Sequence, residues 1–279
     1  MKEVVNKPVL VLGGKGKTGR RVVERLQARG RDVRVASRST VPGFDWNDRE
    51  NWSDTLQGVG SVYITYQPDL AVPGAVEAIK YFVELALAAG VRRLVLLSGR
   101  GEEEAQRAEQ VLQGSDADWT IVRAGWFAQN FSENFLMDGV LAGQVVLPAI
   151  ATKEPFVDVD DIADVVVEAL ENDRHIGKLY EVTGSRLMTF ADAVKEISAA
   201  CGRHIQFSEV SHQEYKKLLE AAHLPDDHVW LVMYLFTTVM DGRNEHLNDG
   251  IEQALGRPPK DFTAYARDVA QSGAWALAS

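Results

Sequence analysis

Short apolar runs alternate with amphipathic segments along the first half of the chain. Five runs have the length and composition of buried strands: residues 9–12, 33–36, 61–65, 93–97 and 119–122. Between them, apolar side chains recur at the spacing of one helix face, first from Gly19 to Leu26 and again from Val76 to Ala86. Strands interleaved with helices predict an α/β protein of Rossmann type, with a doubly wound parallel sheet.

This alternation weakens after about residue 147. One more strand is expected over residues 177–182. Acidic or hydroxyl residues that precede apolar stripes mark further helix starts: Asp158 or Asp160, Thr189, Ser211 and Asp261. We therefore expect a Rossmann domain over residues 1–147 and a smaller, mostly helical C-terminal domain over residues 148–279, with segments that return to the first domain.

Composition and charge narrow the class of partner. The chain is 46% hydrophobic and 25% charged, as in globular proteins. Its formal net charge of -10 repels phosphate backbones and anionic lipid, which favours a small-molecule partner over nucleic acid or a membrane. The single cysteine, Cys201, fits a cytoplasmic protein. The six histidines are not spaced as metal ligands, so no metal is expected. Whether the protein forms a homodimer is left open.

A glycine-rich turn follows the first apolar run. Gly13 would permit the tight turn, Gly16 would let backbone approach a pyrophosphate, and Gly19 would let the helix pack closely on the strand. The free N–H groups of the helix start would bind the phosphates of a dinucleotide. An ATP or GTP phosphate loop is excluded because Val11 stands where that motif needs glycine. The predicted cofactor-binding residues here are Gly13, Gly14, Gly16, Lys17, Thr18 and Gly19.

The residues at the end of the second apolar run indicate which nicotinamide cofactor the chain binds. An NAD site favours an acidic residue there, whereas an arginine suits the 2′-phosphate of NADP. This chain has Ser37, Arg38 and Ser39, so we expect NADP(H), with Arg38 on the phosphate and both serines donating hydrogen bonds. Asp45 is expected to cover the adenine.

Ligands of such sheets lie at the carboxyl ends of the strands. That rule adds Thr65, Tyr66, Ser98 and Gly99 to the cofactor site. Tyr66 and Ser98 are the candidate proton donors, although the catalytic residue itself stays unknown. The expected substrate-binding residues are Tyr66, Trp126, Phe127 and Asn130. For Phe127 an aromatic core position is an equal alternative.

The Tyr-x-x-x-Lys pair of common short-chain dehydrogenases is absent, because none of the seven tyrosines has a lysine four positions later. Reduction of a ketone develops negative charge on oxygen and normally uses a proton donor. Reduction of an iminium ion needs only the transfer of hydride. Quinones and enones accept hydride with modest help from the protein. The absence therefore favours an iminium or imine, a quinone or an enone as the acceptor, or else no catalysis.

The chain resembles the NmrA-like atypical short-chain dehydrogenase/reductase family. This family resemblance rests on residues 13–19, 119–127 and 156–163. Within the family, residues 241–244, 255–258 and 273–275 look closest to the festuclavine/agroclavine dehydrogenase-like branch. The resemblance implies a Rossmann fold, NADPH and reduction of an iminium intermediate. Where many relatives carry the tyrosine and lysine, this chain has Gly101 and Ala105.

Together these features favour an NADPH-dependent reductase of a small, partly aromatic substrate. The alternative is a regulatory protein that senses NADP(H) without catalysis. An isomerase that keeps its cofactor tightly bound is a third reading.

Overall fold

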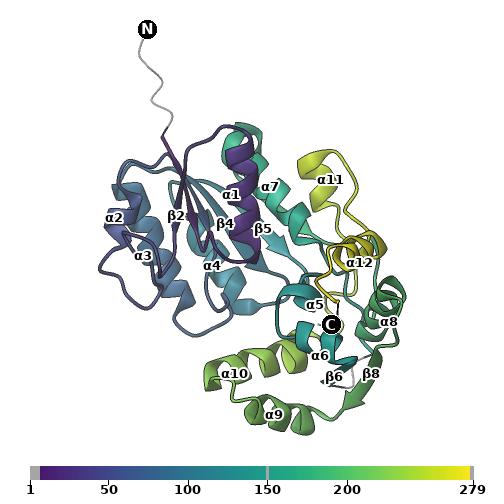
Figure 1. The fold of residues 1–279 in the computed structure, drawn as a ribbon. Coiled ribbons are helices and arrows are strands. Elements are labelled where there is room, and N and C mark those ends of the chain that lie inside the picture. Colours follow the sequence, from purple (N-terminus) through teal and green to yellow (C-terminus); the bar gives the residue numbers. More distant parts are fainter. Residues whose placement is uncertain (1–6, 149–150, 277–279) are drawn as a thin grey trace. The chain divides into compact units, whose positions relative to one another are not determined.

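The computed structural model describes residues 7–148 and 151–276, which divide into two units (Figure 1). Unit 1 holds the described residues up to Ala124 together with Asp160–Val182 and Gly250–Arg257. Unit 2 holds Gly125–Val159, Thr183–Asp249 and the described residues from Pro258 onward. The chain therefore passes back and forth between the units rather than completing one before the other.

A six-stranded parallel sheet forms the centre of unit 1. Its strands are β1 (Val9–Leu12), β2 (Val33–Ala36), β3 (Ser61–Ile64), β4 (Arg93–Gly99), β5 (Asp118–Ala124) and β7 (Lys178–Val182). They lie in the order β2-β1-β3-β4-β5-β7, and every neighbouring pair is parallel. All carboxyl ends therefore meet at one edge, called the rim below. The predicted strands and the Rossmann-type sheet are confirmed.

Helices cover both faces of this sheet. They are α1 (Lys17–Ala28), α2 (Trp52–Leu56), α3 (Ala75–Ala88), α4 (Glu103–Gln113), α7 (Val159–Glu171) and α11 (Gly250–Leu255), with a 3₁₀ turn at Asp173–His175. On one face, Ile79 and Phe82 of α3 share a buried core with Leu10 of β1 and Ile64 of β3. The helices α1 and α7 lie on the other face, side by side (Figure 1).

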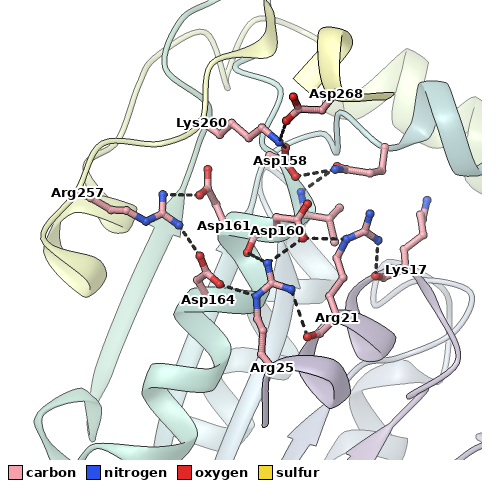
Figure 2. Close-up of polar contacts among 12 residues, drawn as sticks. Lys17, Arg21, Arg25, Asp158, Asp160, Asp161, Asp164, Arg257, Lys260 and Asp268 are labelled. Atoms are coloured by element: carbon pink, nitrogen blue, oxygen red, sulfur yellow. Dashed lines mark hydrogen bonds and ion pairs between the residues drawn. The ribbon is translucent and has the colours of Figure 1, made fainter. Parts of the chain in front are cut away.

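Six charged side chains join α1, α7 and the segment after α11 in an ion cluster: Arg21, Arg25, Asp160, Asp161, Asp164 and Arg257 (Figure 2). Arg25 lies 2.8 Å from Asp160 and 2.5 Å from Asp164. Arg257 lies 2.6 Å from Asp161 and 2.5 Å from Asp164. The acidic start of α7 therefore holds arginines of two other segments.

Unit 2 combines a short parallel strand pair with helices. The elements are α5 (Asn130–Glu133), α6 (Met137–Ala142), β6 (Gln144–Pro148), α8 (Phe190–Cys201), β8 (Gln206–Val210), α9 (His212–Ala221), α10 (Asp226–Tyr234), a π-helical turn (Leu235–Val239) and α12 (Phe262–Gln271). Phe131, Phe156, Phe190 and Phe236 lie in its core. The predicted helix starts at Thr189 and Ser211 are confirmed and both form capping boxes, and Asp261 caps α12. That residues 148–279 form a substrate-binding domain stays a prediction.

None of the helices in the described part of the chain is long and apolar enough to cross a membrane.

Candidate functional site

The glycine-rich turn connects β1 to α1 at the rim. Gly13 has a positive φ of 61°, which favours glycine, and its N–H donates to the carbonyl of Ala36 at the end of β2 (2.9 Å). The N–H of Gly16 donates to the carbonyl of Gly13 (2.8 Å), which closes the turn. The backbone of the turn is thus fixed between the two strands that border the expected site.

Close packing explains the spacing of the glycines. A Cβ atom on Gly19 would lie 2.8 Å from the Cα of Gly14 and closer still to the carbonyl oxygen of Gly13. A Cβ on Gly14 would lie 2.8 Å from Val35 Cγ1. On Gly16 it would lie 3.2 Å from the Gly13 oxygen, a tight but smaller conflict. Gly19 and Gly14 therefore serve the approach of helix to strand, while Gly16 leaves open backbone at the helix start.

The start of α1 has the features of an anion site. Its N-cap is Gly16, which has no side chain to accept a hydrogen bond, and the first turn carries no acidic residue. The first N–H groups of a helix lack partners within the helix and lie at the positive end of its dipole. Lys15 and Lys17 add positive charge beside them. The free N–H groups of the helix start and the two lysines beside them therefore fit the pyrophosphate of a dinucleotide cofactor.

The segment after β2 holds the predicted 2′-phosphate residues. Arg38 is exposed and makes no hydrogen bond or ion pair with the other residues described. The Ser37 and Ser39 hydroxyls lie 3.3 Å apart, and Lys15 Nζ donates to Ser39 Oγ over 2.7 Å. This hydrogen bond joins the glycine turn to the end of β2. One lysine and two hydroxyls thus lie together at this corner of the rim, and Arg38 stands between the two serines in the sequence, a set of donors that suits a phosphate.

Asp45 and Thr65 are occupied by structural contacts. The Asp45 carboxylate accepts the N–H of Asn47 (2.9 Å), and the Asp45 carbonyl accepts the indole N–H of Trp52 (2.8 Å). The Thr65 hydroxyl donates to the carbonyl of Leu12 (3.3 Å), against Gly13. Trp46, which follows Asp45, is only 8% exposed and donates to the Thr65 carbonyl (2.9 Å). Asp45 and Thr65 therefore hold the loops of the rim in place. Their contact with a cofactor stays a prediction.

Tyr66 lies next in the same loop and is half-buried. Its ring centroid is 4.7 Å from that of Trp46. Burial raises the pKa of the Tyr66 phenol, while the charge of Arg49 lowers it by less. A phenol with a raised pKa keeps its proton at neutral pH, which is compatible with a donor role but does not identify one.

The Ser98 hydroxyl is committed to a buried neighbour. It donates to Glu109 Oε1 of α4 over 2.6 Å. Arg123 of β5 holds the same carboxylate with two nitrogens and also lies 3.2 Å from Glu181 of β7. Hydrogen bonding to Glu109 raises the pKa of the Arg123 guanidinium. Ser98 is thus part of a buried network under the rim, and its role as a proton donor stays a prediction.

Asp69 and Glu102 form a pair of carboxyl groups that the sequence analysis did not identify. Asp69 follows β3 and Glu102 precedes α4, so both lie at the rim. The two side chains are hydrogen-bonded to each other. Gly99 lies against Glu102, since a Cβ there would lie 2.5 Å from the Glu102 carboxyl carbon, and its contact with the cofactor stays a prediction. The only sequence signal was a polar residue after each strand.

The predicted substrate-binding residues of unit 2 lie close together in sequence and space. The Trp126 ring centroid is 5.2 Å from those of Phe190 and Phe236, and the Trp126 side chain is partly exposed. The N–H of Asn130 donates to the carbonyl of Phe127 (3.1 Å), and Phe127 bridges to Val157. Trp126 therefore joins the aromatic core of unit 2 while keeping a free edge.

The acidic residues before and within α7 have partners other than a metal. Asp160, Asp161 and Asp164 belong to the ion cluster described above. Within unit 2, Asp158 accepts a hydrogen bond from Gln129 (2.6 Å) and lies 3.2 Å from Lys260 (Figure 2). Asp160, expected to mark a helix start, lies in the first turn of α7 and also pairs with Arg21 and Arg25.

Comparison with known proteins identifies relatives along the whole chain. The family described as NAD(P)H-binding matches residues 13–173. Prestalk A differentiation protein A of Dictyostelium discoideum is 26% identical, over 94% of this chain and 92% of that protein. Festuclavine synthase I of Penicillium roqueforti is 27% identical, over 94% and 98%. An NAD(P)H azoreductase of Xenophilus azovorans is 25% identical, over 93% and 96%.

Solved structures share the fold at low identity. Citrobacter triphenylmethane reductase complexed with NADP(H) superposes with a TM-score of 0.78 at 17% identity, over 94% of this chain and 99% of that chain. An NADPH-dependent quinone oxidoreductase from Escherichia coli complexed with NADPH gives 0.78 at 18%, over 94% and 99%. These similarities confirm the predicted Rossmann-type architecture.

Proposed function

The chain belongs to the NAD(P)H-binding family, and we propose that it is an NADPH-dependent reductase whose acceptor is a quinone, an enone, or an imine or iminium in a small, partly aromatic molecule. The predicted class, an NAD(P)H-dependent oxidoreductase, is confirmed by relatives of that class. The predicted resemblance to NmrA-like reductases, with festuclavine and agroclavine dehydrogenases among the relatives, is confirmed too.

One observation carries the choice of NADPH over NADH. Arg38 is exposed at the end of β2, with no ion pair among the residues described, and Lys15 and Ser39 lie beside it. An unpaired guanidinium has five donors in a planar fork that matches a phosphate. Holding the 2′-phosphate with Arg38 would satisfy donors that the protein leaves open.

The acceptor class is supported by two independent lines. Named relatives and structural neighbours include an azoreductase, a festuclavine synthase, a quinone oxidoreductase and a triphenylmethane reductase, whose names describe aromatic molecules or dyes. The chain itself lacks the Tyr-x-x-x-Lys pair that ketone reduction in common short-chain dehydrogenases uses. Tyr66, Trp126, Phe127 and Asn130 remain our candidates for contact with the substrate.

The cofactor assignment is tested by titrating the protein with NADPH and with NADH and following nicotinamide fluorescence. We expect wild type to bind NADPH at least tenfold more tightly than NADH. Arg38→Ala should raise the Kd for NADPH about tenfold or more, because a charge-assisted hydrogen bond contributes roughly 1.5–3 kcal/mol. It should leave the Kd for NADH unchanged.

Arg107→Ala serves as the matched control. Arg107 is an exposed arginine of α4 that pairs only with Glu103 and Glu104 of its own helix among the described residues. Its removal should change neither Kd. Equal, weak binding of both nucleotides by wild type would count against the proposed cofactor.

A cofactor-sensing regulator remains the second candidate function. It is favoured by the relative named for differentiation, and by the Ser98 hydroxyl, which points to Glu109 and leaves one fewer donor for catalysis. A panel of quinones, enones and cyclic iminium ions separates the two functions. Tight NADPH binding without NADPH oxidation on any member would favour the sensor.

A further inference from the structure

The carboxyl pair of Asp69 and Glu102 lies at the rim, between the loop after β3 and the start of α4. Asp69 Oδ1 accepts the N–H of Ala71 (2.9 Å), which fixes that carboxyl group. The Glu102 carboxyl group packs on the bare Cα of Gly99, at the end of β4. A side chain at position 99 would displace the end of the Glu102 side chain, so glycine there lets this carboxyl group pack against the end of β4.

The environment of Glu102 is unfavourable for a negative charge. The residue is only 7% exposed, and its buried Oε2 atom accepts no hydrogen bond from an N–H or O–H group of the described residues. Its neighbouring charged groups are Asp69 and Glu109, both acidic. The arginines Arg100 and Arg123 pair with other carboxylates, Arg100 with Glu181 and Arg123 with Glu109 and Glu181.

A hydrogen bond between two carboxyl groups requires a proton on one of them. Two carboxylates in contact cannot both be ionised without large repulsion, so such pairs retain one proton at neutral pH. Burial raises the pKa of Glu102 well above its ordinary range, and the charge of Asp69 raises it further. The pair titrates as one unit, so the retained proton belongs to both residues.

We propose that Asp69 and Glu102 share one proton and donate it to the substrate as it is reduced. This inference rests on the proposed reductase function and narrows its acceptor to a quinone or another group that must gain a proton. Reduction of a quinone consumes one hydride, which NADPH supplies when bound, and one proton, which the pair donates to the quinone oxygen. The pair then regains a proton from water.

The test compares an acceptor that needs a proton with one that does not. Wild type, Glu102→Gln and Asp69→Asn are assayed for NADPH oxidation with 1,4-naphthoquinone and with N-methyl-3,4-dihydroisoquinolinium, alongside fluorescence titration of NADPH. Glutamine preserves the shape and hydrogen bonding of a protonated glutamate but is not an acid. Glu103→Gln, an exposed carboxylate on the next residue, is the matched control.

We expect Glu102→Gln to lower kcat with the quinone about 100-fold or more, the usual contribution of a positioned acid. Activity with the iminium ion and the Kd for NADPH should stay within threefold of wild type. In wild type, kcat with the quinone should fall at alkaline pH as the pair loses its proton. This fall in kcat at alkaline pH should be absent when the iminium ion is the acceptor.

Three results would overturn this assignment. Quinone kcat of Glu102→Gln within threefold of wild type would remove the pair from proton transfer. Equal losses with both acceptors would make it a positioning element only. A wild-type pH profile that is identical for both acceptors would overturn it even if the variants failed to fold. By contrast, a wild-type protein that binds NADPH but oxidises it with no acceptor would overturn the reductase function itself.

Discussion

At the scale of single residues, the glycine turn contains two positions with separable roles. Gly19→Ala places a methyl group against the backbone of Gly13 and Gly14, which cannot yield. We expect it to destabilise the protein by about 1–3 kcal/mol, the range for overpacking, and to abolish NADPH binding. Thermal unfolding with a nucleotide titration measures both effects.

Gly16→Ala is the informative counterpart to Gly19→Ala. Its methyl group would lie 3.2 Å from the Gly13 oxygen, which a small shift relieves, but it would project where the pyrophosphate is expected. Stability should therefore change by under about 1 kcal/mol while the Kd for NADPH rises at least tenfold. If both variants lost stability equally and kept their affinity, the phosphate site would lie elsewhere.

Local patterns made some residues of the site predictable and left others hidden. The candidate residues that could be predicted from the sequence are the glycines, Arg38 and the serines beside it, because a turn and the strand before it are contiguous in sequence. Asp69 and Glu102 come from different loops, and only the parallel register of β3 and β4 brings them together. The partner of Ser98 was hidden for the same reason, because Glu109 lies a helix away.

At the scale of elements, strands were predictable where burial was complete. β1 and β3 are buried along their whole length, so their sequences are apolar apart from Ser61 at the start of β3. β8 was missed because none of its residues is buried and three of its five residues are polar, and β6 is its only partner strand among the described residues. The return of β7 to the sheet of unit 1 depends on long-range pairing with β5.

The ion cluster between α1 and α7 makes a prediction about element packing. Asp164→Asn removes one of the two carboxylate partners of both Arg25 and Arg257. We expect a loss of about 1 kcal/mol in the free energy of unfolding, since the charges form a partly buried network rather than an isolated pair. Urea denaturation at low and high salt should show the loss shrinking as salt rises.

Glu104→Gln provides the comparison for that experiment. Glu104 pairs with Arg107 on the outer surface of α4, where both side chains are well exposed. Its removal should cost under about 0.5 kcal/mol. Equal costs for the two substitutions would show that the α1–α7 cluster contributes no more than a surface pair.

At the scale of the whole molecule, the carboxyl pair predicts how stability depends on pH. The folded protein holds the Glu102 proton to a higher pH than the unfolded chain, whose glutamate titrates near 4.5. The folded state is therefore penalised progressively as pH rises from that value through the raised pKa. Glu102→Gln has no proton to lose and escapes this penalty.

Glu102→Gln should accordingly match wild type in Tm at pH 4 and exceed it at pH 8. The excess should be about 2–4 °C, the shift that roughly 1 kcal/mol produces in a chain of this size. Calorimetry at both values of pH measures it. A variant less stable than wild type at pH 8 would show that Glu102 is ionised in the folded protein and has a favourable partner.

The interrupted path of unit 1 has a consequence for its biosynthesis. Its sheet needs β7, and Gly250 at the start of α11 packs so closely on the backbone of Glu181 that a Cβ there would lie 2.8 Å from the Glu181 carbonyl carbon. Arg257 then completes the ion cluster. A nascent chain therefore cannot finish its nucleotide-binding unit until the segment up to Arg257 has left the ribosome, and a product halted before residue 250 would expose apolar surface to chaperones and proteases.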